Sequence, residues 1–236
     1  MKKEDIFDAW GFPPGKGDIH REITREALIP LGFDRSTIDF LARVGRFQDI
    51  RFHVGPLYLG APSPSHFERS WVVRNGNPEL HLKAFEGGRR FLVYCVRNIV
   101  SSLGAYPESV DRISRNKKAM LNFGRALHTL QDFFSHSNYI DLNKDQREKV
   151  SYTLFHPEVA PPDYIRIVYV GLHFFIDHYP HGAFGFGETK DNPSWTKGGK
   201  ERFLRAKMEA VEHTREFVLK LFDGTLYRRY VLQEIL

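Results

Sequence analysis

The chain has 236 residues, of which 42% are hydrophobic and 14% aromatic, which excludes extended disorder and allows one large domain with a substantial core. The formal net charge of +5 favours anionic partners such as phospholipid headgroups, or it reflects an ordinary solvated basic surface. The single cysteine, Cys95, excludes an internal disulfide framework and a cysteine-rich zinc site, and its apolar neighbours predict a buried thiol.

The N-terminal sequence and the hydropathy pattern predict a cytoplasmic protein as encoded. Residues 1–9 include two lysines but no apolar core of a signal peptide. No uninterrupted apolar stretch approaches the length of a membrane span. No linker or internal repeat divides the chain, so we expect a single domain over residues 1–236.

The first third of the chain predicts two helices and a long loop. Asp18 can cap a helix that Pro30 ends, and a short helix is expected over residues 36–44. Residues 45–79 are rich in Gly, Pro, Ser and Asn, which favours an irregular loop. Such a long loop is uncommon in a compact domain unless it is functional, and a bound metal would supply the order that it lacks.

The middle of the chain predicts two long helices. Apolar spacing indicates a helix over residues 80–103, which Gly87-Gly88 either interrupts or opens to a close approach. Ser114 or Asn116 can cap a second helix that runs to about His136.

The last third predicts helices separated by loops. Residues 142–163 are expected to be partly loop. A helix is expected to start at Pro161-Pro162 and to end near Pro180, and a glycine-rich loop should follow over residues 181–199. A final helix is expected over residues 199–222. Only residues 164–170 are β-branched enough to be ambiguous between helix and strand. The predicted fold is therefore an all-α, multi-helix domain with long irregular loops around a metal cleft.

The most informative pattern is His128, Asp132 and His136. Their four-residue spacing places them on one helical face with a drift of about 40° per step. Two imidazoles and a carboxylate on one face form a suitable site for a divalent metal, and zinc is the usual occupant of such N/O sites. The alternative is a polar helix face with satisfied histidines.

Other possible ligands are scattered along the chain. His20 lies on the first predicted helix, and Asp49 and His66 lie in the predicted loop. His173, Asp177 and His181 repeat the spacing, although Pro180 disfavours a helix there. Four further histidines are interpreted as ordinary core or surface residues: His53, His81, His156 and His213.

The segment from Ala126 to Asn138 closely resembles the signature of the zinc-dependent phospholipase C superfamily, especially its branch related to the fungal Het-C heterokaryon-incompatibility proteins. The wider superfamily also includes the fungal single-strand nucleases. Weaker matches follow in the expected order: Trp10 and His20, residues 20–28, Asp49, residues 65–68, 181–182, 190–193 and 210–214.

This resemblance implies an all-α fold with a zinc cluster in a cleft and hydrolysis of a phosphodiester, including phospholipid. It also implies that one zinc is held by Asp49, His66, His128 and Asp132. Asp132 would bridge to a second zinc that His20 also binds, and His136 would contribute to a third. Asp49 is the candidate general base.

The chain departs from the family pattern in two places. In the family, the N-terminal Trp binds metal through its free amine. Trp10 could do so only after cleavage between Ala9 and Trp10, which would make residues 1–9 a removable extension. The family's late histidine and carboxylate pair has no clear match, and His178 or His181 would have to substitute. We therefore expect one to three zinc ions.

Two alternatives to a phospholipase C-like enzyme stay open at this point. One is a related metalloenzyme that acts on a non-lipid substrate. The other is a Het-C-like interaction module with a structural metal that contacts anionic membranes through its basic and aromatic residues. The sequence carries no recognisable nucleic-acid motif, which argues against nucleic acid as a partner, and it leaves the oligomeric state open.

Overall fold

The computed structural model describes residues 19–53, 65, 67, 78–167 and 199–228, without the side chains of residues 46, 47, 49–53, 78 and 227. Within these ranges every regular element is a helix, which confirms the all-α prediction, and the one extended pairing is a bridge between Ser137 and Ile167. None of the described helices combines the length and apolar content that a membrane span needs. The elements are α2 (Ile19–Leu28), η1 (Ile29–Leu31), α3 (Arg35–His53), α4 (Pro78–Leu103), α5 (Val110–Ser114), α6 (Lys117–His136), η3 (Tyr139–Asp141), α7 (Lys144–Phe155), α8 (Gly199–Phe222) and α9 (Thr225–Tyr227).

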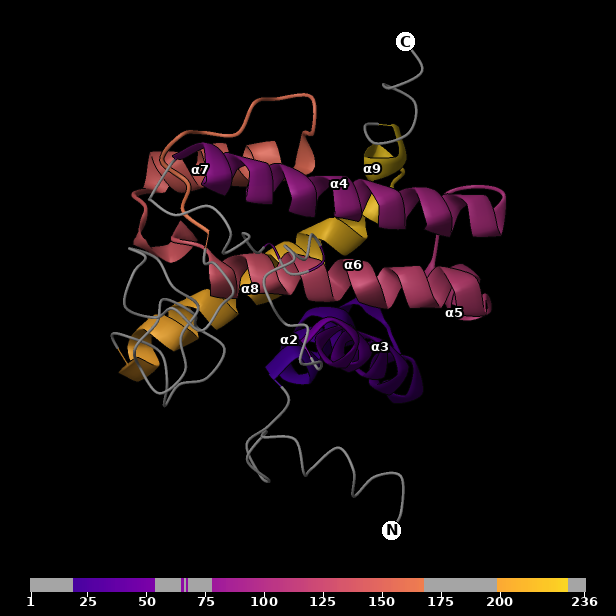
Figure 1. The fold of residues 1–236 in the computed structure, drawn as a ribbon. Coiled ribbons are helices and arrows are strands. Elements are labelled where there is room, and N and C mark those ends of the chain that lie inside the picture. The colour runs from indigo at the N-terminus through magenta and orange to yellow at the C-terminus, as the bar shows by residue number, and fades with distance from the viewer. Residues whose placement is uncertain (1–18, 54–64, 66, 68–77, 168–198, 229–236) are drawn as a thin grey trace.

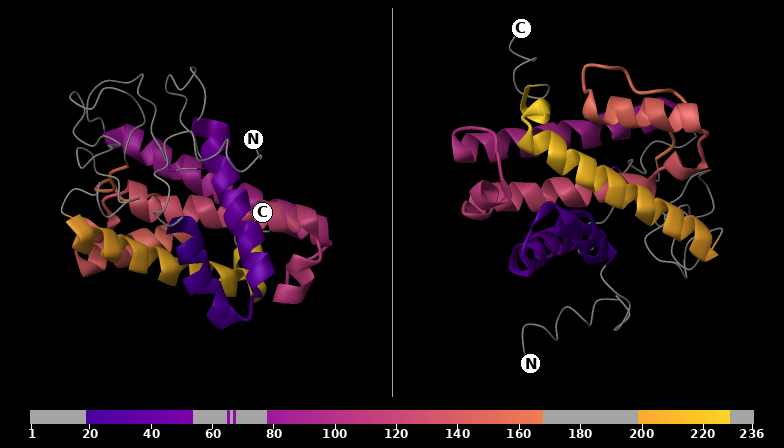
Figure 2. Two further views of the ribbon diagram at one scale, coloured as in Figure 1. Left: turned by 90° about the horizontal axis from the view of Figure 1, so that it is seen from below. Right: turned by 180° about the vertical axis from the view of Figure 1, so that it is seen from behind.

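Helix α6 is the central element. It lies beneath α4 and above the α2–α3 pair, and α8 crosses behind it (Figure 1). The view from behind shows α8 running diagonally across both α6 and α4 (Figure 2). Every residue from Ala126 to His136 is buried, so the second half of α6 is enclosed on all sides. Polar side chains on this stretch must therefore find partners on neighbouring helices.

Local signals explain where α6 begins and how closely α3 approaches it. The Asn116 side chain accepts hydrogen bonds from the backbone N–H groups of Lys118 and Ala119, each at 3.0 Å, so Asn116 is the cap rather than Ser114. A Cβ atom at Gly124 would lie 2.8 Å from the Cβ of Val44. The absence of a side chain at this position therefore lets the two helices pack closely.

Several predicted helices are confirmed with nearly the expected ends. These are the helix that ends at the 3-10 turn containing Pro30, the helix over residues 80–103, and the final helix over residues 199–222. Gly87-Gly88 does not interrupt α4, and the close approach occurs at Gly88, which faces the ring of Phe67. Cys95 is buried as predicted, and this burial raises the pKa of its thiol to about 12.

The predicted loop over residues 45–79 is wrong at both ends. Helix α3 continues to His53, and α4 already begins at Pro78. The extension of α3 is stabilised by packing on α6, where the Gln48 side chain donates to the Arg125 carbonyl at 3.2 Å. Tertiary contact thus outweighs the weak helical pattern.

The helix predicted to start at Pro161-Pro162 is also wrong as far as Ile167. The Asn138 side chain donates to the Tyr164 carbonyl and accepts from the Arg166 N–H. These bonds, together with the bridge to Ser137, hold the segment extended beside the end of α6. The rest of that predicted helix, and most of the loop predicted over residues 181–199, lie outside the described residues.

A buried arginine attaches α7 to α4. The side chain of Arg89 is only 1% exposed, and its guanidinium donates to the carbonyls of Thr153 (2.8 Å), His156 (3.1 Å) and Val159 (2.7 Å). It also pairs with Glu86. This positive charge lies beside the C-terminal end of α7, where it complements the helix dipole. It gives these carbonyls a charged donor in addition to the backbone N–H groups that bond to Thr153 and His156.

We predict that Arg89→Met destabilises the protein by about 3 kcal/mol, because buried carbonyls lose a charged donor. Urea unfolding measures the change. The exposed neighbour Arg90→Met is the matched control and should alter stability by less than about 0.5 kcal/mol. Equal effects of the two substitutions would contradict this role of Arg89.

Candidate metal centre

Two helices bring three metal-ligating side chains together. His20 comes from α2, and His128 and Asp132 come from successive turns of α6. The Asp132 Oδ1 atom lies 3.2 Å from His20 Nε2, and its Oδ2 atom lies 3.1 Å from His128 Nε2. One ligand atom from each residue falls within 4.8 Å of the other two, a spacing that suits a shared ion. We call these three residues the His–Asp–His group.

The carboxylate of this group is buried and charged. The side chains of Asp132 and His128 are 2% and 1% exposed, and that of His20 is 15% exposed. Burial by itself would raise the pKa of Asp132, but the charges of His128 and His20, and their hydrogen bonds, hold that pKa well below its usual range. An ionised carboxylate in such a place requires a positive charge beside it, carried by a protonated imidazole or by a metal ion.

A second layer of hydrogen bonds orients His20. Its Nδ1 atom lies 3.0 Å from Gln131 Oε1, while Gln131 Nε2 donates to Thr24 Oγ1 at 3.1 Å. Because an amide oxygen only accepts, Nδ1 carries the proton, and Nε2 is the atom directed at Asp132. Metal-binding histidines usually donate their second N–H to such a partner. The arrangement therefore fits a divalent cation held between His20 Nε2 and the carboxylate.

Helix α3 closes the other side of the group. A Cβ atom added at Gly45 would lie 3.3 Å from His128 Nδ1, so the bare backbone of this residue makes room for the imidazole. Asp49 follows Gly45 by one turn of the same helix, although its side chain lies outside the described residues.

The structure does not place every predicted ligand with this group. His136 is buried at the C-terminal end of α6, eight residues beyond His128. That separation corresponds to about 12 Å along a helix, too far for the two imidazoles to hold the same ion. Four predicted ligands lie outside the described residues and remain predictions: Trp10, His66, His178 and His181.

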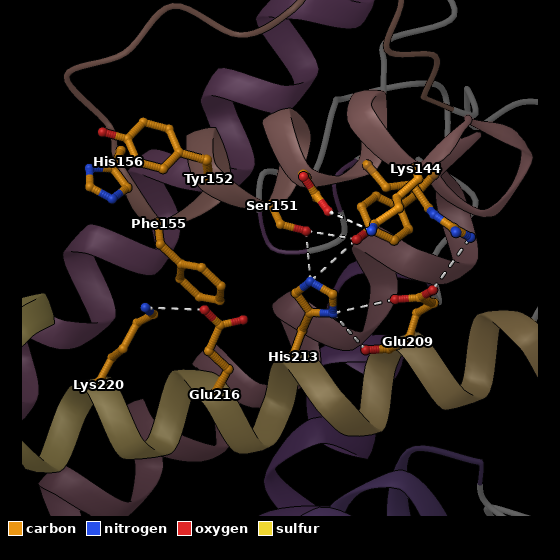
Figure 3. Close-up of a pocket in the computed structure, with 12 residues that line it drawn as sticks. Lys144, Ser151, Tyr152, Phe155, His156, Glu209, His213, Glu216 and Lys220 are labelled. Atoms are coloured by element: carbon orange, nitrogen blue, oxygen red, sulfur yellow. Dashed lines mark hydrogen bonds and ion pairs between the residues drawn. The ribbon is translucent and has the colours of Figure 1, made fainter.

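One polar cluster was missed by the sequence analysis. His213, interpreted above as an ordinary histidine, lines a hollow of about 440 Å³ between α7 and α8 together with Ser151 (Figure 3). The two residues lie 62 positions apart in the chain, so no motif spacing connects them. Only the packing of the two helices brings them into contact.

Comparison with protein-family models, with curated proteins and with solved structures finds no match for this chain. Function must therefore be inferred from the residues themselves, from their resemblance to the family signature and from the geometry of the His–Asp–His group.

We predict that Asp132 contributes to acid unfolding of the metal-free protein. A carboxyl whose folded pKa lies below its ordinary value near 3.8 adds stability above that value, and this stability is lost as the pH falls through the folded pKa. In the presence of EDTA, stability of the wild type should fall below about pH 4, and Asp132→Asn should flatten this dependence. Urea unfolding across the pH range tests it, with the exposed Asp111→Asn as control; identical curves for wild type and Asp132→Asn would refute it.

Proposed function

We propose that the protein is a metal-dependent hydrolase of phosphodiester bonds, similar to the zinc-dependent phospholipases C. The observation that carries this proposal is the convergence of two imidazole nitrogens and one buried carboxylate within 4.8 Å. Such a set of nitrogen and oxygen donors suits zinc. The pairing of His20 with His128 and Asp132 also agrees with the ligand set that the family resemblance implies.

The side chains of the group have distinct roles in this proposal. Asp132 directs one oxygen at each imidazole, so it would contribute to any ion held in the group. Gln131 accepts from His20 Nδ1, so Nε2 is the nitrogen that would bind a metal when the imidazole is neutral. A bound zinc would supply Lewis-acid stabilisation of charge on a phosphoryl oxygen.

The remaining members of the site come from the resemblance alone. Asp49 is proposed as a ligand and general base. Further ligands are proposed from His66, His136, and His178 or His181. The amine of Trp10 would join them only after removal of residues 1–9.

The burial of the group favours a second candidate function. The hollow beside His20, which Gln131 and Ser135 also line, has a volume of about 10 Å³, enough for about one water molecule and too small for a phosphodiester. An ion enclosed in this way could be structural and attach α2 to α6, as in an interaction module that contacts anionic membranes. A structural ion would stabilise the fold without supporting turnover.

Metal analysis is the first test. Elemental analysis of protein purified without chelator or affinity metal should give one to three zinc ions per chain. Asp132→Ala should lose the metal and reduce phosphodiester turnover to background, whereas the exposed Asp111→Ala should keep both, with circular dichroism confirming that each variant is folded. A chain that takes up no zinc, or an Asp132→Ala variant that still hydrolyses, would disprove the enzyme proposal.

A substrate panel separates the two candidates and the lipid from the non-lipid alternative. Phosphatidylcholine vesicles, a single-stranded oligonucleotide and bis(p-nitrophenyl) phosphate cover the three relevant classes of diester. Hydrolysis of the vesicles supports phospholipase C-like activity, and hydrolysis of the other two alone supports a non-lipid substrate. Zinc that raises Tm without any hydrolysis, together with binding to anionic vesicles, supports the structural role.

The hydrogen bond to His20 makes a sharper prediction. Gln131→Leu removes the acceptor for Nδ1–H and should weaken zinc binding by about 10–100-fold, because the imidazole loses its orientation. Competition with a zinc-sensitive dye measures the affinity. Asn122→Leu is the matched control, since Asn122 is a buried amide on the same helix that donates to the backbone carbonyl of Lys118 instead. Similar affinities for the two variants would show that Gln131 does not orient a ligand.

A further inference from the structure

The hollow between α7 and α8 contains a serine and a histidine in direct contact. Ser151 Oγ lies 2.7 Å from His213 Nε2 (Figure 3). Ser151 belongs to α7 and His213 to α8, and both side chains line the cavity of about 440 Å³. The pair is therefore beside a space large enough for a small molecule.

The hydrogen bonds of His213 settle which of its nitrogens carries the proton. Nδ1 lies 2.9 Å from the backbone carbonyl of Glu209 and 3.8 Å from its Oε2 atom. The carbonyl oxygen only accepts, so Nδ1 is the protonated nitrogen, whereas Oε2 lies beyond hydrogen-bond distance. Nε2 then presents a lone pair, and the Ser151 hydroxyl donates to it. A serine that donates to an oriented neutral imidazole has the arrangement of a nucleophile with its general base.

Ser151 differs from an ordinary helical serine. A serine inside a helix commonly donates to the carbonyl four residues earlier, as Ser102 does to Asn98 at 2.6 Å. The Ser151 hydroxyl instead bonds across the cavity to His213 and to Tyr139, whose hydroxyl lies 2.7 Å away. The Tyr139 hydroxyl also lies 3.4 Å from His213 Nε2, but Ser151 at 2.7 Å is the closer donor to that nitrogen. With the serine proton directed at His213, Tyr139 donates to Ser151. That phenol remains protonated at neutral pH, because burial raises its pKa to about 12.

Surrounding residues hold the pair in position. The ring of Phe134 contacts the His213 ring at a centroid distance of 4.6 Å, and Arg147 lies 3.6 Å from the Glu209 carboxylate. The aromatic rings of Tyr152 and Phe155 line the same cavity. Fixed polar groups beside an aromatic wall suit a substrate with one polar reacting centre and an apolar substituent.

We propose that Ser151 and His213, whose imidazole is oriented by the backbone carbonyl of Glu209, form a separate site that hydrolyses small carboxylic esters without a metal. Ser151 Oγ attacks the ester carbonyl carbon as its proton moves to His213 Nε2, and the carbonyl π pair moves to oxygen. When the electron pair on that oxygen re-forms the carbonyl double bond, the bond between the carbonyl carbon and the alkoxy oxygen breaks. His213 then gives its proton to the leaving alcohol. Water then repeats the sequence on the acyl-serine, releases the acid and restores Ser151. Tyr139 donates a hydrogen bond to Ser151 Oγ and so helps to hold the nucleophile in place.

This site is distinct from the His–Asp–His group. Asp132 and Phe134 are two positions apart on α6, so their side chains diverge by about 200° around the helix. Phe134 contacts His213, whereas Asp132 contacts His20 and His128. The two sites lie on opposite sides of α6, and ester hydrolysis should be independent of zinc.

The test uses the full chain in EDTA with two probes, a fluorophosphonate and p-nitrophenyl butyrate. We expect the fluorophosphonate to attach to Ser151, as identified by peptide mass spectrometry. Ser151→Ala should abolish labelling, and both Ser151→Ala and His213→Gln should lower kcat/KM for the ester by about 100-fold or more. Ser102→Ala, a half-buried helical serine elsewhere, should change neither. Glu209→Gln keeps the backbone carbonyl that accepts from His213 Nδ1, so it should change kcat and KM for the ester only slightly.

Labelling is measured on the wild-type protein, so a negative result cannot be attributed to misfolding of a variant. No labelling, labelling of a different residue, or ester hydrolysis that persists in folded Ser151→Ala would overturn the proposal. Ester hydrolysis that disappears in EDTA or in folded Asp132→Ala would assign the activity to the metal centre and would also overturn it. Ester hydrolysis that survives both treatments supports the separate site, whatever the result of the phosphodiesterase tests.

Discussion

The ionised carboxylate of Asp132, buried in the middle of the protein, is the constraint on which the functional part of the structure depends. A charge excluded from water requires a counter-charge and hydrogen bonds, and here two imidazoles supply the immediate contacts. One of them, His20, belongs to a different helix, so satisfying the carboxylate also attaches α2 to α6. The same geometry that compensates the charge is the geometry in which a divalent ion would be held.

Helix α6 gains its importance from being enclosed. An apolar helix in this position would contribute only packing. Helix α6 also carries polar side chains in its buried half, and residues on its different faces contact different neighbouring helices. Gln131 bonds to α2, while Phe134 packs against His213 of α8. Because a buried polar group without a partner is costly, such a helix orders the elements around it as well as covering them. Helix α6 therefore supplies His128 and Asp132 to the His–Asp–His group on one side and packs against His213 on the other.

Local sequence signals predicted those elements whose ends depend on local chemistry. Pro30 ends the first helix because proline restricts the backbone, and Asn116 caps α6 through its own side chain. The errors occurred where distant residues decide the conformation. Helix α3 continues past residue 44 because it packs on α6, and residues 164–167 are extended because Asn138 bonds to their backbone. Neither contact leaves a pattern within the segment concerned.

The candidate sites divide in the same way. The sequence by itself determined that His128 and Asp132 share a helical face, since a four-residue spacing on a helix is a local property. Their association with His20 was expected from family resemblance, and only the tertiary structure brings the atoms within contact distance. The contact between Ser151 and His213 had no signal in the sequence at all. The physical reason is that helix periodicity is set by neighbouring residues, whereas the packing of two helices depends on the whole core.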